Sequence, residues 1–326
     1  MNKRLKGLVV VFALTALVCV SALSGCTKKS TALNDSNLNP KTAEVKSKPT
    51  IKVGSKDFTE SLILAEIYSI ALEKAGYKIE RKFNLSSAVV HTTLINGDID
   101  FYPEYTGTGL LSVLKEEPKF DSKEVYDVVA AKYKEKFKLI WLEPSSANDG
   151  QGLVISKKAS DLYNIRTITD LQKNAGKIRF ASQGEFNERA DGLPSLIKTY
   201  GDFKFKDEKI YDNGLKYDVL HNDKADVAVA YTTEGQLSKD EFVVLKDDKH
   251  AWPPYNIAPV IKQDVLEKNP EIKDILNSVT SKIDNKTIIK LNAEVDIDKK
   301  EYTEVAKNFY NTVFVKWKMD NDRWEV

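Results

Sequence analysis

The sequence predicts an α/β protein with two similar lobes, and two observations lead to that prediction. Residues 51–54 form a short strand that runs through a loop into a helix, and the same order recurs later in the chain. The segments 100–109 and 226–235 also align without gaps, because each is a strand that ends in Tyr-Thr before a turn. We expect Tyr105 and Tyr231 at the carboxyl ends of strands, where open α/β sheets bind ligands. Chance likeness of two strand ends is the alternative.

The elements follow in order from hydrophobic spacing and turn residues. Asp57–Glu60 has capping-box spacing, the isoleucines that follow repeat at helical intervals, and Gly76 ends the helix. After residue 175, a strand at 178–181 is followed by a polar loop and by a helix that begins near Pro194. Two later helices are expected to pack on the first lobe, at residues 264–284 and 299–313.

The order of the elements also predicts the extent of each lobe. The first lobe is expected to span residues 51–150 and to resume at 236–326, and the second lobe covers 151–235. The chain then crosses twice between the lobes. Two crossovers suit a hinge that closes a cleft on a small molecule.

The composition argues against several classes of protein. The chain of 326 residues is 42% hydrophobic, which is enough for a sizeable core. Lys and Arg total 49 and Asp and Glu total 48, so no excess of positive charge indicates a nucleic-acid partner. Three histidines without ligand-type neighbours indicate no metal site, and no cofactor is expected. An enzyme is the less favoured alternative, because the sequence has no nucleophile elbow, Walker loop or convincing triad.

The first twenty-six residues predict export. Basic residues precede an uncharged apolar run at Leu8–Leu23, which is the pattern of a signal peptide over residues 1–25. Leu23–Cys26 resembles the bacterial lipobox, so Cys26 is expected to be lipidated and to anchor the protein outside the cytoplasm on the cell membrane. An uncleaved membrane anchor is the alternative. Residues 26–50 show no hydrophobic periodicity and are interpreted as the lipidated Cys followed by a flexible tether.

Five ordered motifs carry a resemblance to a known family. They are VGSKDFTE (53–60), PEYTGTG (103–109), EFNERADGLP (185–194), AYTT (230–233) and DDKHAWPPY (247–255). In them the chain resembles the substrate-binding proteins of osmoprotectant ABC transporters, which bind glycine betaine, choline or carnitine. The resemblance implies a type II periplasmic-binding-protein fold, in which each of two lobes is a mixed β-sheet flanked by helices. It also implies delivery of the ligand to an ABC permease, and we expect a monomer.

The resemblance implies a box of tyrosines around a trimethylammonium group, with donors for a carboxylate. The residues that match the family's site are Tyr105, Tyr217 and Tyr231 for the box and Lys56, Thr108 and Arg189 for the carboxylate. Gln151 stands where many relatives have a further tyrosine, and Ser87 is either a cleft residue or a helix cap. The chemistry agrees, because a quaternary ammonium has no N–H to donate and aromatic faces must hold its diffuse charge.

The basic residues also rank the ligands. Lys56 and Arg189 favour a ligand with a carboxylate, so glycine betaine comes first, carnitine or proline betaine next, and choline after them. A receptor for an amino acid is the alternative of the same fold, and it calls for an acidic cleft residue and fewer tyrosines. Tyr102, Tyr255 and Trp252 are interpreted as packing residues.

Overall fold

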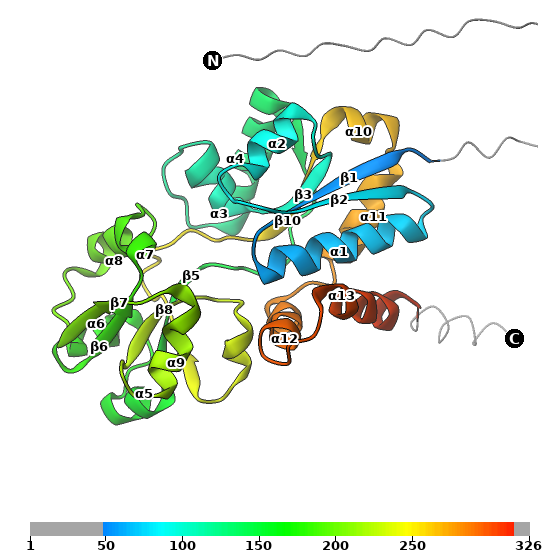
Figure 1. Cartoon of the computed structure of the whole chain (residues 1–326). Coiled ribbons are helices and arrows are strands. Elements are labelled where there is room, and N and C mark those ends of the chain that lie inside the picture. The colour runs from blue at the N-terminus through cyan, green and yellow to red at the C-terminus, as the bar shows by residue number, and fades with distance from the viewer. Residues whose placement is uncertain (1–47, 316–326) are drawn as a thin grey trace, which may run out of the picture. The chain divides into compact units, whose positions relative to one another are not determined.

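The computed structural model describes residues 48–315 (Figure 1). The predicted signal peptide, the Cys26 lipidation site and most of the predicted tether lie outside the described residues. Two five-stranded sheets form the framework of the described part. No helix within it is long and apolar enough to span a bilayer.

The first sheet has the strand order β2-β1-β3-β10-β4. Its strands are β1 (Thr50–Lys56), β2 (Lys78–Leu85), β3 (Phe101–Tyr105), β4 (Leu139–Trp141) and β10 (Ile257–Lys262). β1 runs parallel to β2 and β3, whereas β10 runs antiparallel to β3 and β4. A strand from late in the chain therefore completes a sheet that is otherwise built from early segments.

The second sheet repeats this arrangement in the order β7-β6-β8-β5-β9. Its strands are β5 (Gln151–Ser156), β6 (Arg179–Ser182), β7 (Asp207–Ile210), β8 (Val227–Tyr231) and β9 (Phe242–Val244). β6 runs parallel to β7 and β8, and β5 runs antiparallel to β8 and β9. Both sheets are mixed and have their antiparallel strand in the same position, which confirms the predicted fold class.

Apolar side chains bury both faces of each sheet. Phe101 packs into one cluster of the first sheet, and the next residue, Tyr102, packs into another. Val227 and Ala228 divide in the same way between the two clusters of the second sheet. Because successive strand residues point to opposite faces, these clusters lie on opposite sides of their sheets and require helices to cover them.

Helices provide that cover. The earlier ones are α1 (Thr59–Lys74), α2 (Val90–Asn96), α3 (Thr106–Thr108), α4 (Ser122–Phe137), α5 (Lys157–Tyr163), α6 (Ile168–Asn174) and α7 (Gly184–Glu188). The later ones are α8 (Leu193–Tyr200), α9 (Lys216–His221), α10 (Gln263–Lys268), α11 (Glu271–Thr280), α12 (Asn285–Asp296) and α13 (Tyr302–Tyr310). Figure 1 shows α1 beside β1 and β2, and α1 also contacts α11, α12 and α13. The late helices therefore pack on the first lobe, as predicted.

Two turn residues set helix boundaries, one as predicted and one not. Gly76 follows α1 with a φ of 90°, a left-handed conformation that glycine adopts without strain. The single helix predicted over 264–284 is instead two helices, α10 and α11, separated at Asn269. Pro270 explains the break, because proline lacks the N–H of a helix interior and disfavours helical backbone in the residue before it.

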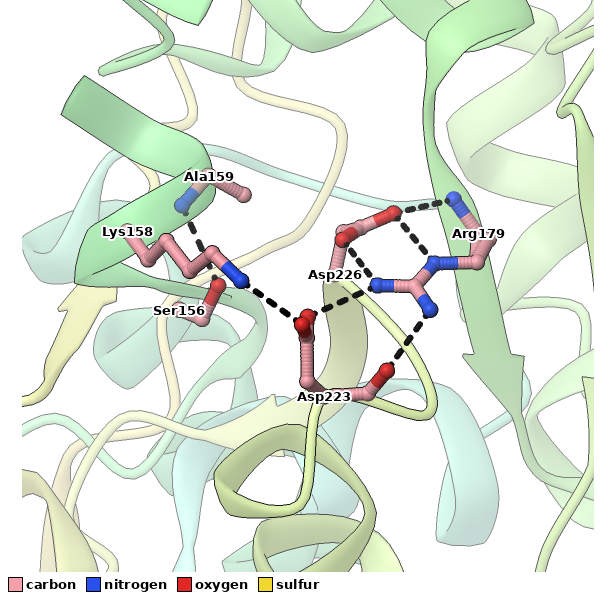
Figure 2. A network of polar contacts seen from close by, with 6 residues as sticks. All are labelled: Ser156, Lys158, Ala159, Arg179, Asp223 and Asp226. Carbon is pink, nitrogen blue, oxygen red and sulfur yellow. Dashed lines mark hydrogen bonds and ion pairs between the residues drawn. The ribbon is translucent and has the colours of Figure 1, made fainter. Parts of the chain in front are cut away.

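The two lobes share an anchor at the start of corresponding strands. Asp100 precedes β3, and its Oδ2 accepts a hydrogen bond from the backbone N–H of Lys52 (2.8 Å). Asp226 precedes β8 and accepts in the same way from the N–H of Arg179 (2.8 Å). Figure 2 shows that the Arg179 guanidinium also holds the carboxylates of Asp226 and Asp223, which ties β6 to the start of β8. The similar sequence segments 100–109 and 226–235 are therefore equivalent parts of a structural repeat.

The threonine after each repeated tyrosine holds a chain crossover. Thr106 Oγ1 accepts a hydrogen bond from the N–H of Asn256 (3.0 Å), and Thr232 Oγ1 accepts one from the N–H of Gly150 (2.9 Å). Asn256 directly precedes β10, and Gly150 directly precedes β5. The repeated Tyr-Thr pairs thus fix two tyrosines and both connections between the sheets.

The second sheet extends beyond residue 235, where the sequence predicts a return to the first lobe. β9 pairs with β5, and Leu245, Ala251 and Trp252 belong to the core of the second sheet. The predicted boundary at 236 is therefore too early. The strand β9 is short and no helix follows it directly, so it lacks the strand–loop–helix pattern on which the boundary depends.

Candidate ligand-binding site

A cavity of about 470 Å³ is lined by residues from both sheets. Seven of the predicted ligand residues line it: Lys56, Ser87, Tyr105, Thr108, Gln151, Arg189 and Tyr231. Phe58 and Tyr255 add aromatic surface, and several carboxylates complete the lining. The structure therefore brings most of the predicted residues together, from segments far apart in the chain.

Tyr105 and Tyr231 reach the cavity because each is the last residue of a central strand, β3 or β8. Tyr105 is only 3% exposed, and its hydroxyl donates a hydrogen bond to Glu60 Oε1 at 2.9 Å. Burial and the Glu60 charge raise the pKa of Tyr105, so the hydroxyl stays neutral. Tyr231 is half-buried, and Lys216 Nζ lies 5.4 Å from its ring centroid. The cavity thus has an aromatic face from each sheet.

Tyr217 lies elsewhere, although its match to the family groups it with these tyrosines. It is on α9 and lines a separate cavity of about 390 Å³. Its hydroxyl donates to Glu234 Oε2, and its ring packs edge-on against Phe242 at a centroid distance of 5.1 Å. These contacts hold the ring against the second lobe's own core.

Tyr255 lines the cavity, although its place in the sequence predicts a packing residue. It is 4% exposed, and its hydroxyl donates to Asp191 Oδ2 at 2.5 Å. Its ring lies against Gly107, whose lack of a side chain allows the approach. The signal in the sequence is the glycine in the Thr-Gly-Thr turn, which leaves room for a ring from the second crossover.

Gly107→Ala is expected to displace the Tyr255 ring and to weaken ligand binding. An added Cβ would lie 2.6 Å from Cδ1 of Tyr255, closer than packed carbon atoms approach. Losing one aromatic face costs about 0.5–2 kcal/mol, so isothermal titration calorimetry should give a roughly two- to thirtyfold higher Kd for glycine betaine. Gly214→Ala is the control, because a Cβ there meets nothing within 4 Å. A wild-type Kd for Gly107→Ala would remove Tyr255 from the binding surface.

Lys56 forms a buried ion pair at the cavity. Its side chain is 3% exposed, that of its partner Glu104 is 2% exposed, and Lys56 Nζ contacts Glu104 Oε1. Glu104 also accepts hydrogen bonds from the Tyr102 hydroxyl (2.7 Å) and the Tyr105 N–H (2.8 Å). Lys56 Nζ lies 4.7 Å from the Tyr105 ring centroid. Because an ammonium has three donors, Lys56 can bind a ligand carboxylate as well as Glu104.

Arg189 also has a carboxylate partner. Its Nε donates to Asp191 Oδ1 (2.8 Å) and its Nη2 donates to Asp191 Oδ2 (2.7 Å), a two-pronged pairing. Burial acts to raise the pKa of Asp191, but the hydrogen bonds from Arg189 and Tyr255 hold it below its usual value. Asp191 thus joins the α7–α8 loop of the second lobe to Tyr255 on the crossover.

The remaining predicted residues occupy the edges of the cavity. Thr108 ends α3 and is half-buried, and Ser87 is exposed in the turn before α2. Gln151 begins β5 opposite Tyr231 in the sheet and is 6% exposed. Its Oε1 has no hydrogen-bond partner among residues 48–315. An amide therefore lies next to Tyr231, at a position that lacks an aromatic face.

Two acidic side chains, Glu60 and Asp149, also line the cavity. The capping box predicted at Asp57–Glu60 is wrong, because α1 begins after Phe58 without a side-chain cap. Glu60 instead accepts a hydrogen bond from Asn292 Nδ2 (3.1 Å) in addition to that from Tyr105. Asp149 accepts from Thr233 Oγ1 (2.6 Å). Burial raises the pKa of both carboxyls, and the Glu60 charge raises that of Asp149 further.

Comparison with known proteins identifies the family. Residues 49–312 match the family described as the substrate binding domain of ABC-type glycine betaine transport system. The chain is 33% identical over 267 residues to the carnitine transport binding protein OpuCC of Listeria monocytogenes serotype 1/2a (strain 10403S). That match covers 81% of this chain and 86% of OpuCC. It is 34% identical over 267 residues to the ergothioneine transport permease/ergothioneine binding protein EgtU of Helicobacter pylori (strain G27). That match covers 81% of this chain and 48% of EgtU, so the chain spans about half the length of that relative.

A solved structure agrees with the sequence comparison. The crystal structure of a glycine betaine/carnitine/choline ABC transporter protein matches with a TM-score of 0.75 and 30% sequence identity, over 81% of this chain and 98% of that chain. The likeness extends across both sheets and establishes the type II periplasmic-binding-protein fold. Members of the family are solute-binding receptors of ABC transporters, not enzymes. The chain therefore belongs to the substrate-binding proteins of the ABC-type glycine betaine transport family.

Proposed function

We propose that this protein binds a zwitterionic trimethylammonium compound of the glycine betaine type and delivers it to an ABC permease. The observation that carries the proposal is the position of Tyr105 and Tyr231, which end equivalent strands of the two sheets and line one cavity. The two rings hold the methylated cation, which attracts their electron-rich faces but offers no hydrogen-bond donor. Carnitine and proline betaine fit the same division of roles.

The carboxylate of the ligand binds to Lys56 and Arg189 in this proposal. Both line the cavity, and each already holds a protein carboxylate, Glu104 or Asp191. These internal pairs fix the two basic groups before the ligand arrives, and such preorganisation lowers the entropy cost of binding. Choline lacks the carboxylate and is expected to bind more weakly.

The cellular setting belongs to the same proposal. Lipidation of Cys26 holds the protein outside the cytoplasm at the cell membrane, and residues 26–50 act as a tether. The protein works as a monomer, and its two crossovers bend to close the lobes around the ligand. The first lobe consists of about residues 51–150 together with the chain from β10 onward, and the intervening segment makes the second lobe.

Tyr231→Ala is expected to weaken glycine betaine binding, whereas Tyr231→Phe retains most of it. The alanine variant loses an aromatic face worth about 0.5–2 kcal/mol, or a roughly two- to thirtyfold increase in Kd by isothermal titration calorimetry. The phenylalanine variant keeps the face and loses only the hydroxyl. Tyr163→Ala is the control, because Tyr163 packs at the core of the second lobe and does not line the cavity. Equal affinities for all three variants would contradict the proposal.

A further inference from the structure

Two of the ion pairs at the cavity present their basic member to it. Lys56 and Arg189 line the cavity, but their partners Glu104 and Asp191 are not among the described residues of its lining. In both pairs the positive group therefore faces the ligand, and the negative group lies behind it. This orientation suits the carboxylate of a zwitterion.

A third ion pair has the opposite orientation. Lys216 Nζ contacts Glu234 Oε1, and the two side chains are 3% and 18% exposed. Glu234 lines the cavity, whereas Lys216 does not belong to the lining that the described residues form. Here the negative group faces the ligand, and the positive group lies behind it. Lys216 and Glu234 are called the reversed pair below.

The reversed pair lies beside an aromatic face of the cavity. The N–H of Glu234 donates to the carbonyl of Tyr231 (3.3 Å), so one tight turn contains both residues. Lys216 Nζ lies 5.4 Å from the centroid of the Tyr231 ring. The hydroxyl of Tyr217 donates to Glu234 Oε2 and fixes the carboxylate from the second lobe. A carboxylate and an aromatic ring, which both attract cations, are therefore held together at this end of the cavity.

The other carboxylates of the lining attract a cation less strongly. Burial raises the pKa of Glu60 and of Asp149, which favours the uncharged form of both groups. Asp57 is exposed and Asp296 is half-buried, so water screens their charges. The charge of Glu234 is balanced in another way, because a buried ammonium lies directly behind it.

That ammonium changes which ligands the cavity favours. A lone carboxylate beside the aromatic ring would attract every cation, including one with no carboxylate of its own. With Lys216 behind Glu234, the pair has no net charge, and its effect on a ligand with a net positive charge largely cancels. A zwitterion still gains at both ends, because its own carboxylate binds Lys56 and Arg189. Burying the Lys216 ammonium costs free energy, and selectivity of this kind gives that cost a purpose.

We infer that Lys216 is a specificity-determining residue, which balances the charge of Glu234 from behind Tyr231 and so makes the cavity prefer a zwitterion to a ligand with a net positive charge. The inference rests on the proposed function, because it takes the aromatic and basic subsites as given. Glycine betaine and choline are the matched probes. Both have a trimethylammonium group, but only choline has a net charge.

Lys216→Met tests the inference in the purified protein. The variant removes the positive charge of the reversed pair and keeps the negative one, so choline should gain affinity relative to glycine betaine. The ratio of the Kd for choline to that for glycine betaine should fall by about fivefold or more. Isothermal titration calorimetry gives the Kd of glycine betaine, and its displacement by choline gives a value even for weak binding. Lys157→Met is the matched control, because Lys157 pairs with Asp161 on the surface of the same lobe, with a side chain that is 54% exposed.

Glu234→Gln should shift the ratio in the opposite direction. The glutamine can still accept from Tyr217, but the positive charge of Lys216 stays and repels choline, so the ratio should rise by about fivefold or more. Adding Lys216→Met to Glu234→Gln removes both charges and should return the ratio to within about twofold of the wild-type value. These two proteins differ only at Lys216, so their comparison tests its charge even if Lys216→Met alone fails to fold.

The outcomes separate this inference from the proposed function. Equal factors of change in the two affinities would show that Lys216 only supports the fold, and a ratio that shifts in the same direction in both single variants would also overturn the inference. Saturable binding of glycine betaine by the wild type would leave the proposed function intact in either case. No binding of glycine betaine, carnitine or choline by the wild type would contradict the proposed function and the inference with it.

Discussion

Glu104→Gln is expected to lower the free energy of unfolding by about 3–5 kcal/mol, the usual cost of breaking a buried ion pair. Lys56 and Glu104 have side chains that are 3% and 2% exposed, so neither charge can return to water when its partner is lost. The glutamine can still accept from Tyr102 and Tyr105, but it leaves the Lys56 ammonium without a counter-charge. Urea denaturation followed by circular dichroism measures the difference.

An exposed pair provides the control for this prediction. Lys123 and Asp127 lie one helical turn apart on α4, with 2.6 Å between Nζ and Oδ2 and side chains that are 82% and 54% exposed. Lys123→Gln should cost less than about 1 kcal/mol, because solvent screens such pairs. The double variant Lys56→Met with Glu104→Gln should recover part of the loss, since neither side then has an unpaired charge. A loss for Glu104→Gln no larger than that of Lys123→Gln would contradict the buried pair.

Asp149→Asn is expected to raise the free energy of unfolding near neutral pH by about 1–3 kcal/mol. Burial and the Glu60 charge raise the folded-state pKa of Asp149, and each unit of such a shift corresponds to about 1.4 kcal/mol. A carboxyl with a raised folded pKa stabilises the fold when protonated, and that stability is lost as the pH rises through the folded pKa. The variant removes the ionisation and therefore its cost.

The change of this stability difference with pH tests the direction of the Asp149 pKa shift. Between pH 5 and pH 8, the stability advantage of Asp149→Asn over the ligand-free wild type should grow with pH, because only the wild type ionises at this position. Chemical denaturation at both pH values measures it, and Asp202→Asn, at an exposed position, should show no such trend. An advantage that shrinks toward pH 8 would contradict the assigned direction of the pKa shift. If the trend holds, the ionised Asp149 carboxylate lowers the stability of the ligand-free protein. Residues that line binding sites commonly have such a cost.

Much of the fold can be predicted from the sequence, because the patterns that indicate its elements are local. The alternation of strands and helices, the Gly76 helix end and the repeated Tyr-Thr segments each depend on residues close together in the chain. These signals suffice to identify two mixed sheets and the two tyrosines that end their central strands. The strand β9 could not be predicted, because it has only three residues and no helix directly follows it.

The electrostatics of the site depend on contacts across the chain, and the sequence cannot predict them. Lys56 is expected to hold a ligand carboxylate, but its pairing with Glu104 joins residues 48 positions apart. Glu60 has the spacing of a capping box, and only the packing of α12 against α1 turns it toward Asn292. Tyr255 enters the cavity because Gly107, far away in sequence, leaves space for its ring. The resemblance groups Tyr217 with the box, and the fold of α9 puts it in a different cavity.

One calorimetric experiment tests the central claim, that the cavity recognises a trimethylammonium group attached to a carboxylate. The purified protein is titrated with glycine betaine and, separately, with glycine, which differs only in the three methyl groups. We predict saturable binding of one glycine betaine per chain and no measurable binding of glycine, because only the methylated cation matches the faces of Tyr105 and Tyr231. Saturable binding of glycine without binding of glycine betaine, carnitine or choline would contradict the claim and favour an amino-acid receptor.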